Sequence, residues 1–260
     1  MPPGDIAPTA DDALRQAFDR TPARLLVGQA GPAYRTATWL KLREDHAAAR
    51  DAVRAEVDLL SAFGEERIDR FQLFDTQTRA GSKDEYLRRP DLGRKLSDDS
   101  AELVRTNCQV GRDLQVVIGD GLSATAVAVQ APGLLDLLHT AAVERGWSFG
   151  RPFLVRFCRV GVLNDVGELL RPEVVVLLVG ERPGLATAES LSAYLAFRPK
   201  AGHTDADRNL VSNIHARGVS PEQAVARVIA LAEQFRTVGR SGVGITEPPS
   251  QLHRSLAQDA

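Results

Sequence analysis

Cysteine and aromatic residues are scarce in this chain of 260 residues. The two cysteines, Cys108 and Cys158, lie far apart and outside any CxxC pair, so the sequence predicts a reduced, cytoplasmic protein without a disulfide framework. Aromatic residues make up 5% of the sequence and methionine occurs once, so the core must be built from alanine, valine and leucine. That composition suits helices packed on a sheet better than an aromatic-rich β-sandwich.

The sequence also lacks a large excess of charge, a long apolar run and the common metal-binding patterns. Its formal net charge of −2 gives no general attraction to nucleic acid or to an anionic membrane. No apolar stretch approaches the roughly 20 residues that a membrane span needs. The first residues lack the basic flank and apolar core of a signal peptide. Neither CxxC nor HExxH occurs. We therefore expect no nucleic-acid partner, no membrane partner and no metal ligands.

What the sequence does contain is an alternation of apolar strands and helical patterns. Short apolar runs bounded by polar or turn residues predict buried strands over 114–118, 153–157 and 174–179. Helical patterns are found over 123–130, 133–145, 187–196 and 221–235. Ser220 and Pro221 are typical of the start of the last of these helices.

This alternation predicts an α/β fold with a Rossmann-like, mostly parallel sheet and helices on both faces, over residues 107–238. A smaller, mainly helical N-terminal region is expected over 21–106. Residues 1–20 are expected to form a flexible tail, and residues 239–260 a second tail.

The turn Gly119–Ala124 fits the GxGxxA fingerprint of dinucleotide-binding proteins, because it directly follows a predicted strand. The fingerprint also requires an acidic residue at the end of the next strand to bind the ribose. That strand ends at Phe157, Cys158 and Arg159, and no acidic residue stands there. Arg159 could face a 2′-phosphate instead, which leaves a stand-alone NADP-binding oxidoreductase as an alternative function. A tight turn without phosphate is the favoured interpretation.

A second near-motif contains His215. The run from Asn213 to Gly218 differs in one position from the DxHxxG signature through which some cobalamin proteins ligate cobalt. Asn213 replaces the aspartate that would hold the other nitrogen of the imidazole ring, a partner that metal-bound histidines usually have. We therefore interpret His215 as a structural histidine.

The most informative turn follows the apolar run 174–179. It contains Gly180, Glu181, Arg182, Pro183 and Gly184, an unusual density of glycine, proline and charge. Ligands of open α/β sheets bind at the carboxyl ends of strands, where this turn is expected to lie. A neighbouring acid and base at that position suit a ligand that carries amide or phosphate groups.

Three segments carry a family resemblance: 178–185 (LVGERPGL), 189–194 (ESLSAY) and 206–215 (ADRNLVSNIH). The segments 86–94 and 116–123 extend it. Through them the chain resembles the small (light) subunit of ethanolamine ammonia-lyase. The resemblance covers about residues 20–238.

The resemblance implies an adenosylcobalamin-dependent enzyme that converts ethanolamine to acetaldehyde and ammonia by a radical rearrangement. A large subunit then carries the substrate site and the catalytic residues, and this chain contributes none of them. The family's cobalamin-contact positions correspond to Val160, Glu181 and Leu210. Val160 and Glu181 should lie just beyond two strands and Leu210 on a following loop, all at one edge of the sheet.

The resemblance also implies an assembly. Units of one large and one small subunit pair into dimers, and these associate as a trimer, in the cytoplasm or within a bacterial microcompartment. A third interpretation of the chain is a pure assembly module that does not touch the cofactor.

Overall fold

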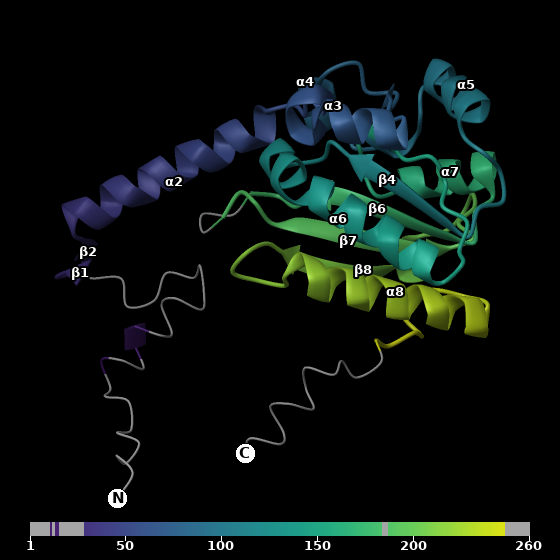
Figure 1. Cartoon of the computed structure of the whole chain (residues 1–260). Coiled ribbons are helices and arrows are strands. Elements are labelled where there is room, and N and C mark those ends of the chain that lie inside the picture. The colour runs from purple at the N-terminus through teal and green to yellow at the C-terminus, as the bar shows by residue number, and fades with distance from the viewer. Residues whose placement is uncertain (1–10, 12–13, 16–28, 184–186, 248–260) are drawn as a thin grey trace, which may run out of the picture.

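The computed structural model describes residues 11, 14–15, 29–183 and 187–247. The expected tail over residues 1–20 therefore falls almost entirely outside the described residues, as does most of the tail over 239–260. At the centre of the molecule is a six-stranded sheet with the order β3-β5-β4-β6-β7-β8 (Figure 1). Its strands are β3 (Asp75–Gln77), β4 (Leu114–Gly119), β5 (Phe153–Arg156), β6 (Val174–Gly180), β7 (Leu191–Phe197) and β8 (Asn209–Ile214).

Four strands of the sheet, β3, β5, β4 and β6, run parallel to one another, whereas β7 and β8 are added antiparallel. The structure thus confirms a mixed α/β fold with a mostly parallel sheet. The predicted strands at 114–118, 153–157 and 174–179 are also confirmed. The narrower Rossmann-like assignment stays a prediction.

Helices cover both faces of the sheet. The described helices are α2 (Thr36–Arg54), α3 (Leu59–Phe71), α4 (Lys83–Arg88), α5 (Asp98–Asn107), α6 (Ala124–Glu144), α7 (Val162–Leu170) and α8 (Pro221–Val238). The core on one face joins α3, α6 and α8, and the core on the other joins α5 and α7. Strand β4 contributes side chains to both cores, because successive residues of a strand point to opposite faces of the sheet. Val116 and Ile118 lie in the first core and Val117 lies in the second.

The segment predicted as a helix over 187–196 is not one; its residues from Leu191 onward form strand β7, which pairs with β6. Leu191 and Leu195 are four residues apart, which imitates a helical face. The pattern that folding uses is the alternation of Leu191, Ala193 and Leu195 toward one core and Tyr194 toward the other. Pairing along the whole length of β6 selects the two-residue period of a strand over the 3.6-residue period of a helix.

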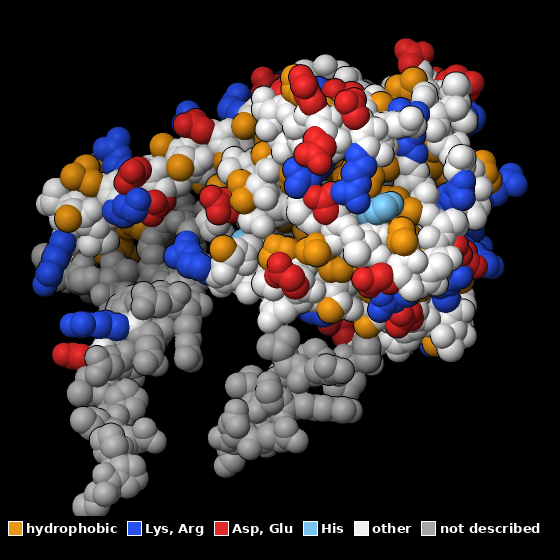
Figure 2. Space-filling model, viewed as in Figure 1, with side chains coloured by type: hydrophobic (Ala, Val, Ile, Leu, Met, Phe, Trp, Pro, Cys, Tyr) orange, Lys and Arg blue, Asp and Glu red, His pale blue; other side chains and the backbone are white. Residues whose placement is uncertain are grey.

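The two helices predicted over 123–130 and 133–145 are one continuous helix, α6, with Pro132 inside it. Pro132 and Ala131 are buried against the first core, so tertiary packing maintains the helix through the position where proline removes a hydrogen bond. By length and apolar composition α6 could cross a membrane, contrary to the sequence-based expectation. Half of that stretch is buried inside the protein, which is equally typical of a core helix. Val129 and Val143 are exposed on its outer side, where Figure 2 shows hydrophobic side chains bordered by charged ones.

The N-terminal part of the described chain is attached to this core in two ways. Strand β3 pairs with β5, so the sheet extends into the stretch expected to be a separate helical region. Helix α4 lies where β4 ends, and α2 projects away from the body of the molecule (Figure 1). A two-stranded hairpin, β1 (Gln29–Ala30) and β2 (Ala33–Tyr34), precedes α2. The boundary at residue 107 stays a prediction.

Candidate functional site

A shallow depression of about 380 Å³ lies at the carboxyl ends of β5 and β6 and continues onto β7 and β8. Val160, Glu181 and Leu210, the three positions singled out from the sequence, all line it. Its other lining residues include Tyr86, Arg159, Arg182, Ser192, Tyr194 and Ser212. Two larger hollows, beside α2 and near the start of β6, contain none of the three predicted positions. The structure therefore gathers the three predicted positions, which are up to 50 residues apart in sequence, into one site.

Glu181 directly follows β6, and its carboxylate holds three strands together. Oε2 accepts a hydrogen bond from the Ser190 hydroxyl at 2.8 Å, and Oε1 accepts one from the Ser192 hydroxyl at 2.8 Å. The backbone amide of Asn213, in β8, also donates to Oε1 at 2.9 Å. A carboxylate can accept about four hydrogen bonds, so Glu181 retains acceptor capacity beyond these three bonds.

Val160 and Leu210 supply apolar surface at two sides of the depression. Val160 lies between β5 and α7, packed beside the second core. Leu210 was expected on a loop; instead it is the second residue of β8, opposite Tyr194 of β7. Alternation along the strand buries Val211 and leaves Leu210 41% exposed. Its side chain is thus an exposed apolar group at the edge of the site.

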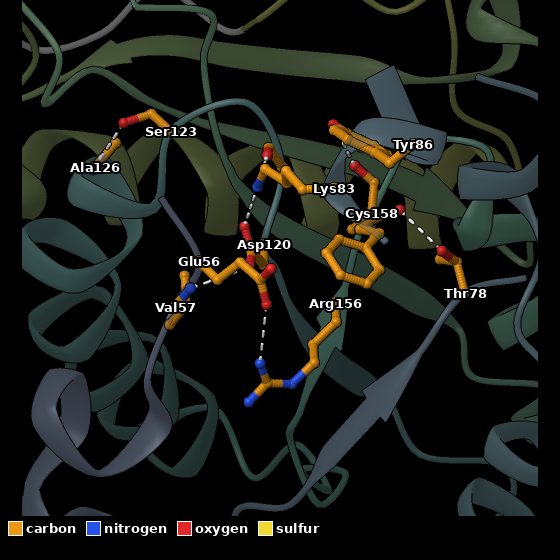
Figure 3. A network of polar contacts seen from close by, with 12 residues as sticks. Glu56, Val57, Thr78, Lys83, Tyr86, Asp120, Ser123, Ala126, Arg156 and Cys158 are labelled. Atoms are coloured by element: carbon orange, nitrogen blue, oxygen red, sulfur yellow. Dashed lines mark hydrogen bonds and ion pairs between the residues drawn. The ribbon is translucent and has the colours of Figure 1, made fainter. Parts of the chain in front are cut away.

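Tyr86, in α4, and Arg159, which follows β5, form another wall of the depression. The Tyr86 ring is buried, and its hydroxyl donates to the carbonyl oxygen of Cys158 at 3.1 Å (Figure 3). The Arg159 guanidinium lies over that ring, 4.2 Å from its centroid, and its Nη2 donates to the Tyr86 carbonyl at 3.4 Å. Burial raises the pKa of Tyr86 well above its ordinary value of 10, so the hydroxyl remains a hydrogen-bond donor at neutral pH.

Side chains and backbone groups of the protein fill the space around the GxGxxA turn. Asp120 is fully buried; its Oδ1 accepts from Nζ of Lys83 at 2.9 Å, and its Oδ2 accepts from the backbone amide of Val57 at 3.0 Å (Figure 3). Lys83 also donates to the carbonyl oxygen of Gly121. A Cβ atom on Gly121 would lie 2.5 Å from a methyl group of Val179. These glycines therefore serve close packing of the chain, and a buried carboxylate lies where the dinucleotide alternative requires space for phosphate.

His215, interpreted from the sequence as a structural histidine, is buried and hydrogen-bonded within the chain. It is 3% exposed, its Nε2 lies 2.7 Å from the side-chain oxygen of Asn213, and its Nδ1 accepts from the backbone amide of Arg217. Burial lowers the pKa of His215, which keeps the ring neutral at pH 7. Gly218 completes the near-motif for a steric reason, since a Cβ there would lie 2.8 Å from Nε2 of His215. Over the described residues, no group of three His, Cys, Asp or Glu side chains could hold a metal ion.

Sequence reasoning missed the groups that support Glu181 and those that form the wall around Arg159. Ser192, Asn213 and Tyr86 lie in segments that carry the family resemblance, but nothing in those segments assigned them to the site. Ser192 lies in the stretch misread as a helix, and Tyr86 is 95 positions before Glu181. The density of charge and glycine after β6 located the site, but the pairing of β7 and β8 determined which side chains surround it.

The chain matches known proteins over nearly its whole length. Residues 11–246 match the family model described as ethanolamine ammonia-lyase light chain. The ethanolamine ammonia-lyase small subunit of Clostridium perfringens is 38% identical over 238 residues, which cover 92% of this chain and 79% of that protein. The small subunit of Clostridium acetobutylicum is 39% identical, covering 90% of this chain and 94% of that protein. That of Fusobacterium nucleatum is 41% identical, covering 86% and 74%. This chain belongs to the ethanolamine ammonia-lyase small-subunit (light-chain) family.

Proposed function

We propose that this chain is the small subunit of an adenosylcobalamin-dependent lyase that converts ethanolamine to acetaldehyde and ammonia, and that it holds the cobalamin at its interface with the large subunit. The observation that carries the proposal is the convergence of Val160, Glu181 and Leu210 on one depression. These residues come from the ends of two parallel strands and from an antiparallel strand.

The chemistry of the depression fits the edge of a corrin ring. The corrin rim carries uncharged amide groups, which donate to carboxylates and accept from hydroxyls. Glu181 offers acceptor capacity, and the Ser212 hydroxyl lines the same depression. Val160 and Leu210 offer apolar surface for the hydrocarbon parts of the rim. When bound, adenosylcobalamin supplies the radical chemistry through its cobalt–carbon bond.

In this proposal the described residues of this chain bind the edge of the cofactor and do not ligate its cobalt. Both ring nitrogens of His215 form hydrogen bonds within the chain, one with Asn213 and one with Arg217. The described residues also contain no cluster that could ligate a metal.

The openness of the site supports a second wall from a partner. A depression of about 380 Å³ can cover only one edge of a corrinoid, whereas bound ligands usually have most of their surface buried. In this proposal the large subunit closes the site, and carries the substrate site and the catalytic residues. The two-subunit units pair and assemble as a trimer, in the cytoplasm or inside a bacterial microcompartment.

The test is a pair of substitutions in the enzyme assembled from this chain and its large subunit. Glu181→Ala should weaken adenosylcobalamin binding in a spectroscopic titration, since it removes the acceptor at the centre of the depression. Glu144→Ala, at the exposed end of α6, should not. Unchanged cofactor affinity in Glu181→Ala would favour the assembly-module interpretation. Ammonia release by this chain alone would overturn the proposal.

A further inference from the structure

Arg159 has hydrogen-bond donors that the protein does not use. A guanidinium carries five N–H donors. Nη2 of Arg159 donates to the Tyr86 carbonyl, whereas Nε is buried without a partner. Among the described residues no carboxylate forms an ion pair with Arg159. The stacking on Tyr86 fixes the plane of the guanidinium, so its remaining donors are held in place at the depression.

Arg182 brings a second guanidinium to the same depression. It directly follows Glu181, is exposed, and has no ion pair within the part of the chain that the structure describes. Burial raises the pKa of Tyr86, and the positive charges of Arg159 and Arg182 both oppose that rise. Both cations are therefore near enough to the Tyr86 hydroxyl to act on it electrostatically.

Neither Glu181 nor Asp120 forms an ion pair with Arg159 or Arg182. The Glu181 carboxylate accepts hydrogen bonds from the hydroxyls of Ser190 and Ser192 and from the amide of Asn213. Asp120 is buried and paired with Lys83. The depression is thus lined by two guanidinium groups and one carboxylate, so it carries an excess of positive charge.

We propose that Arg159 and Arg182 form an anion-binding subsite that takes a phosphate group of the bound ligand. The inference rests on the proposed function. Besides its uncharged amides, cobalamin carries one phosphodiester, in the loop that joins its benzimidazole nucleotide to the corrin ring. Parallel N–H donors of arginine match phosphate oxygens, and such charge-assisted bonds are about twice as strong as neutral ones. Glu181 and the apolar residues then bind the corrin rim, and the two arginines bind the nucleotide loop.

The test compares two corrinoids in the assembled two-subunit enzyme. Adenosylcobinamide has the corrin ring and amides of adenosylcobalamin but lacks the nucleotide loop with its phosphodiester. Arg159→Gln should weaken adenosylcobalamin binding by about tenfold, as expected for the loss of one charge-assisted hydrogen bond, and leave adenosylcobinamide binding unchanged. Equal loss for both corrinoids, or no loss for adenosylcobalamin, would overturn the proposal.

Two further variants control this comparison. Arg171→Gln removes the same charge at the opposite end of β6, where Arg171 ends α7, and should change neither affinity. Arg182→Gln removes an exposed side chain that forms no hydrogen bond or ion pair with the described residues, so the fold should be unaffected. Arg182→Gln should lower the affinity for adenosylcobalamin by less than Arg159→Gln does, and should leave the affinity for adenosylcobinamide unchanged. If Arg159→Gln does not assemble, Arg182→Gln decides the question by the same criterion.

Inorganic phosphate separates the subsite from the identity of the cofactor. If the unsubstituted enzyme binds neither corrinoid, the proposed function fails. The subsite is then judged by calorimetric titration with phosphate. A binding signal that Arg159→Gln abolishes and Arg171→Gln preserves would support the anion site, and the absence of any signal would overturn it. In an enzyme that does bind cobalamin, phosphate should compete with adenosylcobalamin and leave adenosylcobinamide unaffected.

Discussion

The carboxylate of Glu181 accepts a hydrogen bond from the backbone amide of Asn213, 2.9 Å away, across 32 positions of sequence. Asn213 has a left-handed backbone conformation with φ of 61°. Asparagine tolerates that region better than most residues. The same Asn213 holds Nε2 of His215 with its side chain. Glu181 is therefore both a surface of the proposed site and the group that joins the ends of β6, β7 and β8.

This double role predicts that Ser192 stabilises the fold through Glu181. Ser192→Ala removes a buried donor from the carboxylate and should lower the free energy of unfolding by about 1–3 kcal/mol in urea titrations. Ser212→Ala is the matched control, because Ser212 is an exposed serine of the neighbouring strand. A loss no larger than that of the control would show that the Glu181 network adds nothing to stability.

Breaking the buried ion pair of Lys83 and Asp120 should lower the free energy of unfolding by more than Ser192→Ala does. Their side chains are 8% and 0% exposed, so Lys83→Met would leave the Asp120 carboxylate without its charge partner. We expect a loss of about 3–5 kcal/mol in the free energy of unfolding. Lys83→Met combined with Asp120→Asn should regain part of it. Lys95→Met, which breaks a more exposed pair with Asp165, should cost about 1 kcal/mol or less. Equal losses in the two lysine variants would contradict this account.

The buried imidazole of His215 predicts a dependence of stability on pH. Burial lowers the pKa of His215 below its ordinary value of 6.5, so the unfolded chain binds a proton at a pH where the folded chain does not. Its contribution to stability is therefore complete above about pH 6.5 and is lost as the pH falls toward the folded-state pKa. His215→Gln should lower stability at pH 8 and flatten its decline between pH 7 and pH 5.5. Burial lowers the pKa of His139 as well, so a residual slope from that histidine should remain.

Both cysteines should be unreactive in the folded protein. Burial raises the pKa of Cys108 to about 11 and that of Cys158 higher still. Because the thiolate is the reacting form, alkylation at pH 8 should be slow in the native state and rapid in denaturant. Mass spectrometry after timed iodoacetamide treatment measures this directly. Rapid labelling of native Cys158, which is 1% exposed, would mean that the carboxyl end of β5 opens readily.

Several features of the fold followed from local pattern. The apolar runs that became β4, β5 and β6 are buried on both faces, so their assignment required only their length and the residues that bound them. Helix α8 was also predictable, because Ser220 caps it with a capping box that is visible in the sequence. Strand β7 was not predictable from local pattern, because the spacing of its leucines suits both a helix and a strand. Only its pairing with β6 selects the strand.

By itself the sequence determined the α/β class, because apolar periods are local properties of the chain. Its short motifs carried the family resemblance, and that resemblance implied the three positions proposed to contact the cofactor. Tertiary structure decided what surrounds those positions. It brought Tyr86 beneath Arg159, surrounded Glu181 with hydroxyl and amide donors, and filled the fingerprint turn with Lys83. These contacts join segments that are tens of residues apart. They exist because strands pair and helices pack, and so the donors left unused on Arg159 became apparent only in the folded chain.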